Sequence, residues 1–80
     1  MTNTEKLMAA FRAGLGLPGN LEVVELTYRG IPEWDSVAHM QLVMEIESAF
    51  DLMLSTEDVI ALSSFAAATT IVSRHGIAFP

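Results

Sequence analysis

Residues 35–51 read DSVAHMQLVMEIESAFD, and they carry the main signal for the predicted fold. It contains no glycine or proline, and its first residue, Asp35, is a favourable helix N-cap. We therefore expect a helix from about Ser36 to Phe50. At about 100° per residue, one face of this helix is apolar and predicts contact with a core. The residues on that face are His39, Leu42, Val43, Ile46, Ala49 and Phe50.

A second apolar stripe follows the opposite, outward side of the same helix. Val37, Met40 and Met44 recur there, with Glu47 and Asp51 beside them. An apolar stripe flanked by acids is typical of a docking surface, and methionine adapts to several partners. The alternative is that the next, shorter helix covers part of the stripe. We interpret these five residues as a partner-binding face.

The segment before this helix predicts one further helix and a long loop. A stripe at helical spacing predicts a helix over 4–15, with Asn3 or Thr4 as its N-cap; its residues are Leu7, Ala10, Phe11, Gly14 and Leu15. Residues 16–34 predict a loop with at most a short helical turn. The run LEVVELTY alternates in part like a strand, but no second convincing strand exists to pair with it. The helix-ending signals are Gly14, Gly16 and Pro18, and the apolar anchors of the loop are Leu21, Val23, Leu26 and Ile31.

The segment after the central helix predicts a short helix and a last, longer one. Ser55 is an N-cap for a helix at about 56–61, and Ser63 or Ser64 caps a helix over 65–75. The 80 residues thus predict one all-α domain, a four-helix bundle with three longer helices, one short helix and a long first loop. The core residues that we expect include Leu7, Phe11, Leu42, Ile46, Phe50, Leu62, Ala68 and Ile71.

The charge of the chain is acidic and unevenly distributed. The formal net charge is −6, and no lysine or arginine occurs between Arg29 and Arg74. This balance argues against nucleic-acid binding and favours partners with basic surfaces. A solubilising surface is the alternative interpretation. The acids in the interval are Glu33, Asp35, Glu45, Glu47, Asp51, Glu57 and Asp58.

The composition excludes several further classes of protein. The chain has no cysteine, so it offers no disulfide, thiol nucleophile or cysteine metal site. His39 and His75 lie far apart without a ligand spacing, so we expect no metal site. No run approaches the ~20 apolar residues that a membrane span needs, and the N-terminal segment does not resemble a signal peptide. We expect a cytoplasmic monomer.

Ser36 occupies a position that suits an anion. The amides and the dipole at a helix N-terminus favour negative charge, so a phosphate ester on its hydroxyl would be well placed. The alternative is that Ser36 only starts the helix. Asp35, Ser36 and His39 do not predict a catalytic triad, because they are sequence neighbours and no oxyanion hole is apparent. We expect His39 to be partly buried, and Trp34 to shield the helix start or to contact a partner.

Four features of residues 34–76 follow one another in a distinctive order. An aspartate–serine–aliphatic triplet opens the central helix, which closes with Glu-x-x-Phe. The short helix begins Ser-x-Glu-Asp, and the last helix is rich in small residues. These features start at Asp35, Glu47, Ser55 and Phe65. Together they resemble the acyl carrier protein family, and the first helix and long loop also suit the four-helix bundle of that family.

The resemblance implies a function for Ser36. In that family the serine that follows the aspartate is esterified by 4′-phosphopantetheine, which a phosphopantetheinyl transferase takes from coenzyme A. Acyl groups are held as thioesters on the thiol of this arm, so the protein is a carrier and not an enzyme. The resemblance implies further partners: an acyl- or aminoacyl-loading ligase, and a ketosynthase or acyltransferase.

Departures from the family pattern bear on the pathway. Ala38, Gln41 and Ser48 stand where carriers of primary fatty-acid synthesis tend to have acids. This favours a stand-alone carrier of a specialised pathway, with polyketide-like or modified fatty acyl cargo. An aminoacyl carrier of the same fold is the alternative, although a Gly-Gly-x-Ser signature is absent. A small helical interaction module without a prosthetic group is the alternative from a different class.

Overall fold

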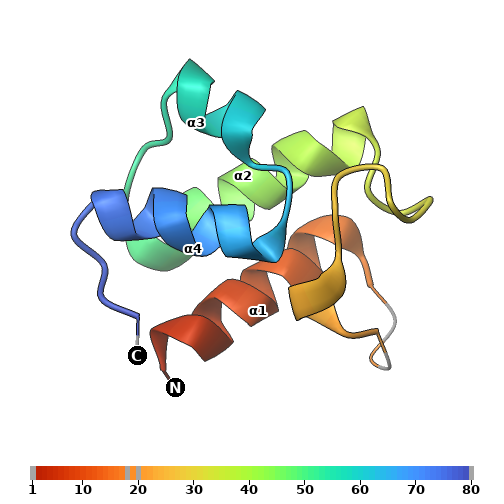
Figure 1. Ribbon diagram of the computed structural model, residues 1–80, viewed down its shortest axis with the longest axis horizontal. Helices are drawn as coiled ribbons and strands as arrows, with labels where there is room; N and C mark the ends of the chain where they lie inside the picture. Colours follow the sequence, from red (N-terminus) through yellow and green to blue (C-terminus); the bar gives the residue numbers. More distant parts are fainter. Residues whose placement is uncertain (1, 18, 20, 80) are drawn as a thin grey trace.

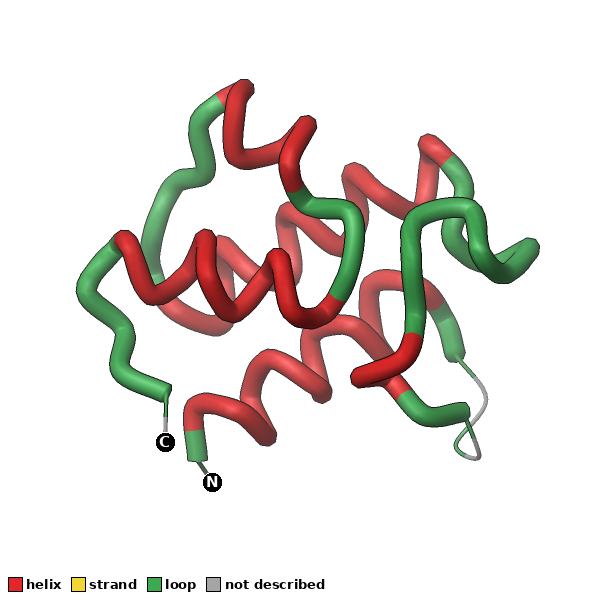
Figure 2. The backbone as a smooth tube through the Cα atoms, in the orientation of Figure 1, coloured by secondary structure: helices red, strands yellow, loops and turns green. Residues whose placement is uncertain are grey.

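The computed structural model describes residues 2–17, 19 and 21–79, and within these residues the fold is all-helical (Figures 1 and 2). The described chain contains no β-strand, which confirms the predicted all-α class. The central helix has the predicted bounds. In chain order the elements are α1 (Asn3–Leu15), a 3-10 turn η1 (Val23–Glu25), α2 (Ser36–Phe50), α3 (Thr56–Ala61) and α4 (Phe65–Arg74).

Each of these α-helices begins at a polar residue whose side chain accepts the backbone N–H three positions later. The predicted caps of α2, α3 and α4 are confirmed, with Ser64 rather than Ser63 capping α4. The predicted cap of α1 at Asn3 or Thr4 is wrong, because the Glu5 side chain bonds back to the Thr2 backbone and completes a capping box there. The four caps are Thr2, Asp35, Ser55 and Ser64.

The core gathers residues from α1, α2, α4 and the connecting loop. All eight predicted core residues are buried. The sequence left two roles open for Trp34, shielding the helix start or contacting a partner. Trp34 is completely buried and packs edge-on against Phe11, with ring centroids 5.5 Å apart. Its role is therefore structural. The other buried apolar residues are Ala10, Leu15, Val23, Leu26, Val43, Phe65 and Val72.

Gly14 lies where α1 comes very close to α2. The prediction that it belongs to the apolar stripe of the first helix is confirmed, because it is buried inside α1, whereas its prediction as a helix-ending signal is wrong. A Cβ atom at this position would lie 2.6 Å from the Cα of Leu42, well inside contact distance. Gly14 therefore brings two helix backbones together. The helix ends instead at Gly16, whose φ of 62° is left-handed, and Pro18 lies outside the described residues.

The connection between α1 and α2 is the predicted long loop. It contains the turn η1, and the predicted anchors Val23 and Leu26 are buried, whereas Leu21 and Ile31 are half-buried. The strand alternative is wrong, because the only pairing near it within the described residues is an isolated bridge between Thr27 and Ser64. The loop is thus tied to the start of α4 without forming a sheet.

The segment after α4 returns to the start of the chain. The Asn3 side chain donates a hydrogen bond to the Ala78 carbonyl at 2.8 Å, and the first turn of α1 and the segment after α4 lie on the same side of Figure 1. The start of α2 lies on the other side of that view. α4 ends at Arg74, one residue before the predicted end, and His75 is its C-cap.

Candidate functional site

The candidate site is the start of α2, where Asp35 and Ser36 have separate roles. Asp35 is in an extended conformation, and its Oδ1 accepts the backbone N–H of Ala38 at 2.8 Å. The capping role at this helix therefore belongs to Asp35. The Ser36 side chain is exposed, and within the described residues its hydroxyl makes no hydrogen bond. Ser36 thus presents a hydroxyl that the helix does not use.

The backbone around Ser36 offers hydrogen-bond donors. The first intrahelical bond of α2 joins the His39 N–H to the Asp35 carbonyl. The amides of Ser36 and Val37 precede it and bond to no other residue that the structure describes. Unpaired amides and the positive end of the helix dipole favour a negative group on or near the Ser36 hydroxyl.

A shallow depression of about 350 Å³ lies beside the start of α2. Arg29 enters its wall in a left-handed conformation with a φ of 63°, and its backbone N–H donates to the Trp34 carbonyl. Because no lysine or arginine follows until Arg74, Arg29 is the basic residue closest in sequence to Ser36. The lining residues are Arg29, Gly30, Ile31, Pro32, Trp34 and Asp35.

The outward stripe of α2 is exposed to solvent. The exposed fractions are 69% for Val37, 50% for Met40 and 59% for Met44. Since α3 does not bury these side chains, the alternative that it covers the stripe is wrong. Viewed down the helix axis, Ser36 lies within about 100° of each residue of the stripe. The free hydroxyl and the exposed apolar side chains therefore share one side of α2.

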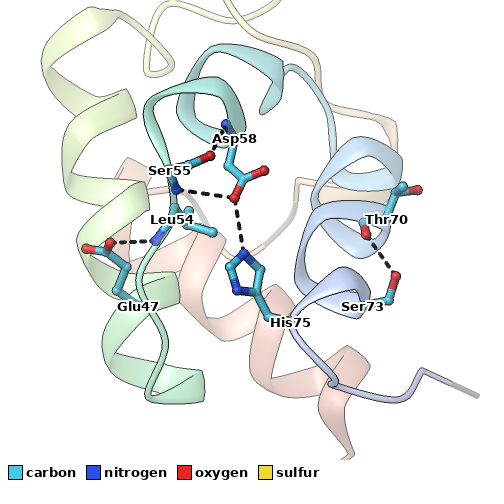
Figure 3. Close-up of polar contacts among 7 residues, drawn as sticks. All are labelled: Glu47, Leu54, Ser55, Asp58, Thr70, Ser73 and His75. Carbon is cyan, nitrogen blue, oxygen red and sulfur yellow. Dashed lines mark hydrogen bonds and ion pairs between the residues drawn. The ribbon is translucent and has the colours of Figure 1, made fainter.

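The two acids predicted beside the stripe differ in their surroundings. Asp51 is exposed and ends α2 in a left-handed conformation with a φ of 52°. Glu47 is half-buried, and its carboxylate accepts the backbone N–H of Leu54 at 2.9 Å (Figure 3). Glu47 therefore fixes the chain before α3, a role that its position on the helix did not reveal.

His39 is occupied by contacts other than Ser36. Its Nδ1 accepts a hydrogen bond from the Trp34 indole at 2.9 Å, and its Nε2 lies 2.8 Å from the Val59 carbonyl. Both ring nitrogens are therefore engaged, so His39 is not placed as a general base for Ser36. The expectation of a partly buried histidine is confirmed.

A second histidine links the last two helices. The His75 Nε2 lies 3.1 Å from the Asp58 Oδ2, which also accepts the Ser55 backbone N–H (Figure 3). The hydrogen bond from His75 and that from Ser55 hold the pKa of the Asp58 carboxyl below its ordinary value. The sequence placed both residues at helix ends but did not show that they meet.

Two negative findings complete the description. In the described parts of the chain, no group of three or more histidine, cysteine, aspartate or glutamate side chains is arranged to hold a metal ion. No helix among the residues described has the length and apolar character needed to cross a membrane.

Comparisons with family models, with curated proteins and with solved structures found no match to this chain. The residues at the start of α2 are therefore the basis for inferring a function.

Proposed function

We propose that this chain is a carrier protein of acyl-carrier type, which holds acyl intermediates as thioesters on a 4′-phosphopantetheine arm esterified to Ser36. The observation that carries the proposal is the free, exposed hydroxyl of Ser36 beside an exposed apolar stripe. Here Asp35 is the cap, and Ser36 remains available for modification.

The residues at the start of α2 fit the group. The arm is joined through a phosphodiester, whose negative charge suits the free amides of Ser36 and Val37 and the helix dipole. The arm supplies a thiol that carries acyl groups as thioesters. The chain itself contains no cysteine, so this arm would be its source of reactive sulfur. The contribution of the chain is attachment, orientation and recognition.

Recognition is proposed to occur through Val37, Met40 and Met44, with Glu47 and Asp51 at the edge. The acids between Arg29 and Arg74 have no nearby basic residue in sequence, so their field attracts a positively charged partner. An enzyme that clamps this side of α2 would have Ser36 at the rim of the contact. The proposed partners are a phosphopantetheinyl transferase, a loading ligase for acyl or aminoacyl groups, and a ketosynthase or acyltransferase.

The cargo is proposed to belong to a specialised pathway. The outward side of α2 is apolar, and Ala38, Gln41 and Ser48 carry no charge where the family's primary fatty-acid carriers tend to have acids. Polyketide-like or modified fatty acyl groups are the proposed cargo, with aminoacyl groups as the alternative. The exposed stripe alone would also suit an interaction module without an arm, so the decisive point is whether Ser36 is modified.

The test is incubation of the purified protein with coenzyme A, magnesium ions and a broad-specificity phosphopantetheinyl transferase. Intact-mass measurement is expected to show the addition of one phosphopantetheine group. The control is Ser36→Ala, which should gain no mass and should keep its helical circular dichroism because Asp35 still caps α2. An unmodified wild-type protein under conditions that modify a known carrier would favour the interaction module.

A further inference from the structure

The helix α3 depends on contacts from outside itself. It has six residues, and none of its side chains is fully buried. Isolated helices this short are not stable in water, because too few hydrogen bonds form to offset the cost of the first turn. Its half-buried Val59 side chain packs against the core, and two side chains from outside α3 bond to it: His75, the C-cap of α4, contacts Asp58, and His39 contacts the Val59 carbonyl. The second contact leads from α3 toward the site at Ser36.

The hydrogen bonds of His39 indicate the tautomer of its ring. The indole N–H of Trp34 is a donor only, so the Nδ1 of His39 must accept and must carry no proton. The proton of the neutral ring is then on Nε2, which donates to the Val59 carbonyl. Trp34 is completely buried, which fixes the direction of its N–H. A buried residue of the loop thus orients a residue of α2, which in turn binds α3.

A small apolar pocket lies beside this contact. It has a volume of about 270 Å³, and His39 and Val59 both line it. Tyr28 covers one side, with its ring centroid 5.1 Å from that of His39, and Leu62 behind it is buried. A long acyl chain could pass between α2 and α3 only if α3 moved away, and that movement would break the His39–Val59 bond.

We propose that His39 is a positioning residue that latches α3 to α2 and so keeps cargo larger than this pocket outside the bundle. The exclusion of cargo depends on the proposed attachment of an arm at Ser36, whereas the latch itself does not. The latch requires the donor on Nε2 to reach Val59 and requires Trp34 to hold the ring. Cargo on the arm would then remain exposed to partner enzymes.

The first experiment measures amide hydrogen exchange in the unmodified protein for wild type, His39→Leu, His39→Asn and His39→Gln. Glutamine can place a donor near the position of Nε2, whereas asparagine reaches only the position of Nδ1 and leucine offers neither. Loss of the bond to the Val59 carbonyl predicts about three- to tenfold faster exchange of the Val59–Ala61 amides, relative to the amides of α1 and α4, in the leucine and asparagine variants. The glutamine variant should stay closest to wild type.

Amides of α1 and α4 serve as internal references, because a variant without an acceptor at the Nδ1 position leaves the buried Trp34 indole N–H unpaired and lowers the stability of the whole fold. The exchange of the α3 amides is therefore compared with theirs in each variant. Equal α3 exchange in wild type and His39→Leu would overturn the latch. So would a glutamine variant that exchanges as fast as the leucine variant, because His39 would then act by filling space alone.

The second experiment loads Ser36 with a pantetheine arm that ends in a long acyl group bearing a polarity-sensitive fluorophore. Wild type is expected to show the emission of the dye in water, and His39→Leu the shifted emission of an apolar environment. The same emission from both proteins would contradict the proposal that the latch keeps cargo outside the bundle. Failure to load Ser36 would contradict the carrier function and the exclusion of cargo together, whereas the exchange experiment would still test the latch.

Discussion

The contact between α1 and α2 and the attachment of α3 are built in opposite ways. Where α1 crosses α2, Gly14 brings the backbones so close that even a Cβ atom would collide with Leu42. The helix α3 buries no side chain fully. Its half-buried Val59 packs against the core, and polar contacts from Glu47, His39 and His75 hold it and the chain before it. We expect such a helix to open locally at a lower free energy than the tightly packed crossing of α1 and α2, on which Ser36 stands.

The largest effect is expected from truncation at the tightly packed crossing of α1 and α2. Leu42→Ala removes a completely buried side chain and should lower the free energy of unfolding by about 2–5 kcal/mol. In a domain of this size that corresponds to a melting temperature lower by about 10 °C or more. The matched control is Ile60→Ala on α3, where the side chain is 78% exposed and the expected change is within about 0.5 kcal/mol. Similar losses of unfolding free energy in both variants would contradict the contrast between the contact of α1 with α2 and the attachment of α3.

A smaller loss is expected when a methyl group is added between α1 and α2. Gly14→Ala must separate the helices, because the added atom meets the Leu42 backbone and not a side chain that could rotate away. We expect a net loss of about 1–3 kcal/mol, although alanine favours the helix more than glycine does. Thermal melts of Gly14→Ala and of Gly19→Ala, which has open space around it, measure the difference. A Gly14→Ala variant as stable as wild type would show that the crossing is looser than described.

The attachment of α3 should weaken in acid. The folded-state pKa of Asp58 is lowered, so its contribution is complete above the ordinary aspartate pKa of about 3.9 and is lost as the pH falls through the lowered value. Asp58→Asn imitates the protonated form at every pH. At neutral pH its α3 amides should exchange faster than those of wild type, and at low pH the two proteins should agree after correction for intrinsic rates.

The control for this prediction is Glu57→Gln, which removes an equal charge from the same turn of α3 and leaves the Asp58–His75 contact in place. Its α3 exchange should keep the pH dependence of wild type. If Asp58→Asn also kept that dependence, another group would be responsible.

The smallest effect is expected from a single charge at the proposed partner-binding face of α2. Glu47→Gln keeps an acceptor for the Leu54 amide and removes only the charge. The rate of Ser36 modification by the cognate transferase should fall severalfold at low ionic strength. It should approach the wild-type rate near 1 M salt, where the screening length is ~3 Å. Glu22→Gln, on the segment that leads into η1, makes the same change of charge away from α2 and should have little effect at either salt level.

The features that could be predicted from the sequence are local ones. Asp35, Ser55 and Ser64 bond to amides three residues away, and the two stripes of α2 follow from helical spacing alone. The missed features depend on pairs that the fold brings together. His39 meets Val59 and Asp58 meets His75 across two elements, and no spacing rule connects them. Gly14 was predicted both on the apolar stripe of the first helix and as one of its ending signals, since a glycine near a helix end fits a stop and a close crossing equally well.

The proposed carrier function depends most directly on where a phosphopantetheine arm is attached. After reaction with coenzyme A and the transferase, the protein would be digested and the modified peptide sequenced by tandem mass spectrometry. We predict a single phosphopantetheine on Ser36 and none on Ser48, Ser55, Ser63 or Ser64. A label on any of those four serines, or no label in a protein whose circular dichroism shows that it is folded, would contradict the carrier function and the role assigned to the free hydroxyl at the start of α2.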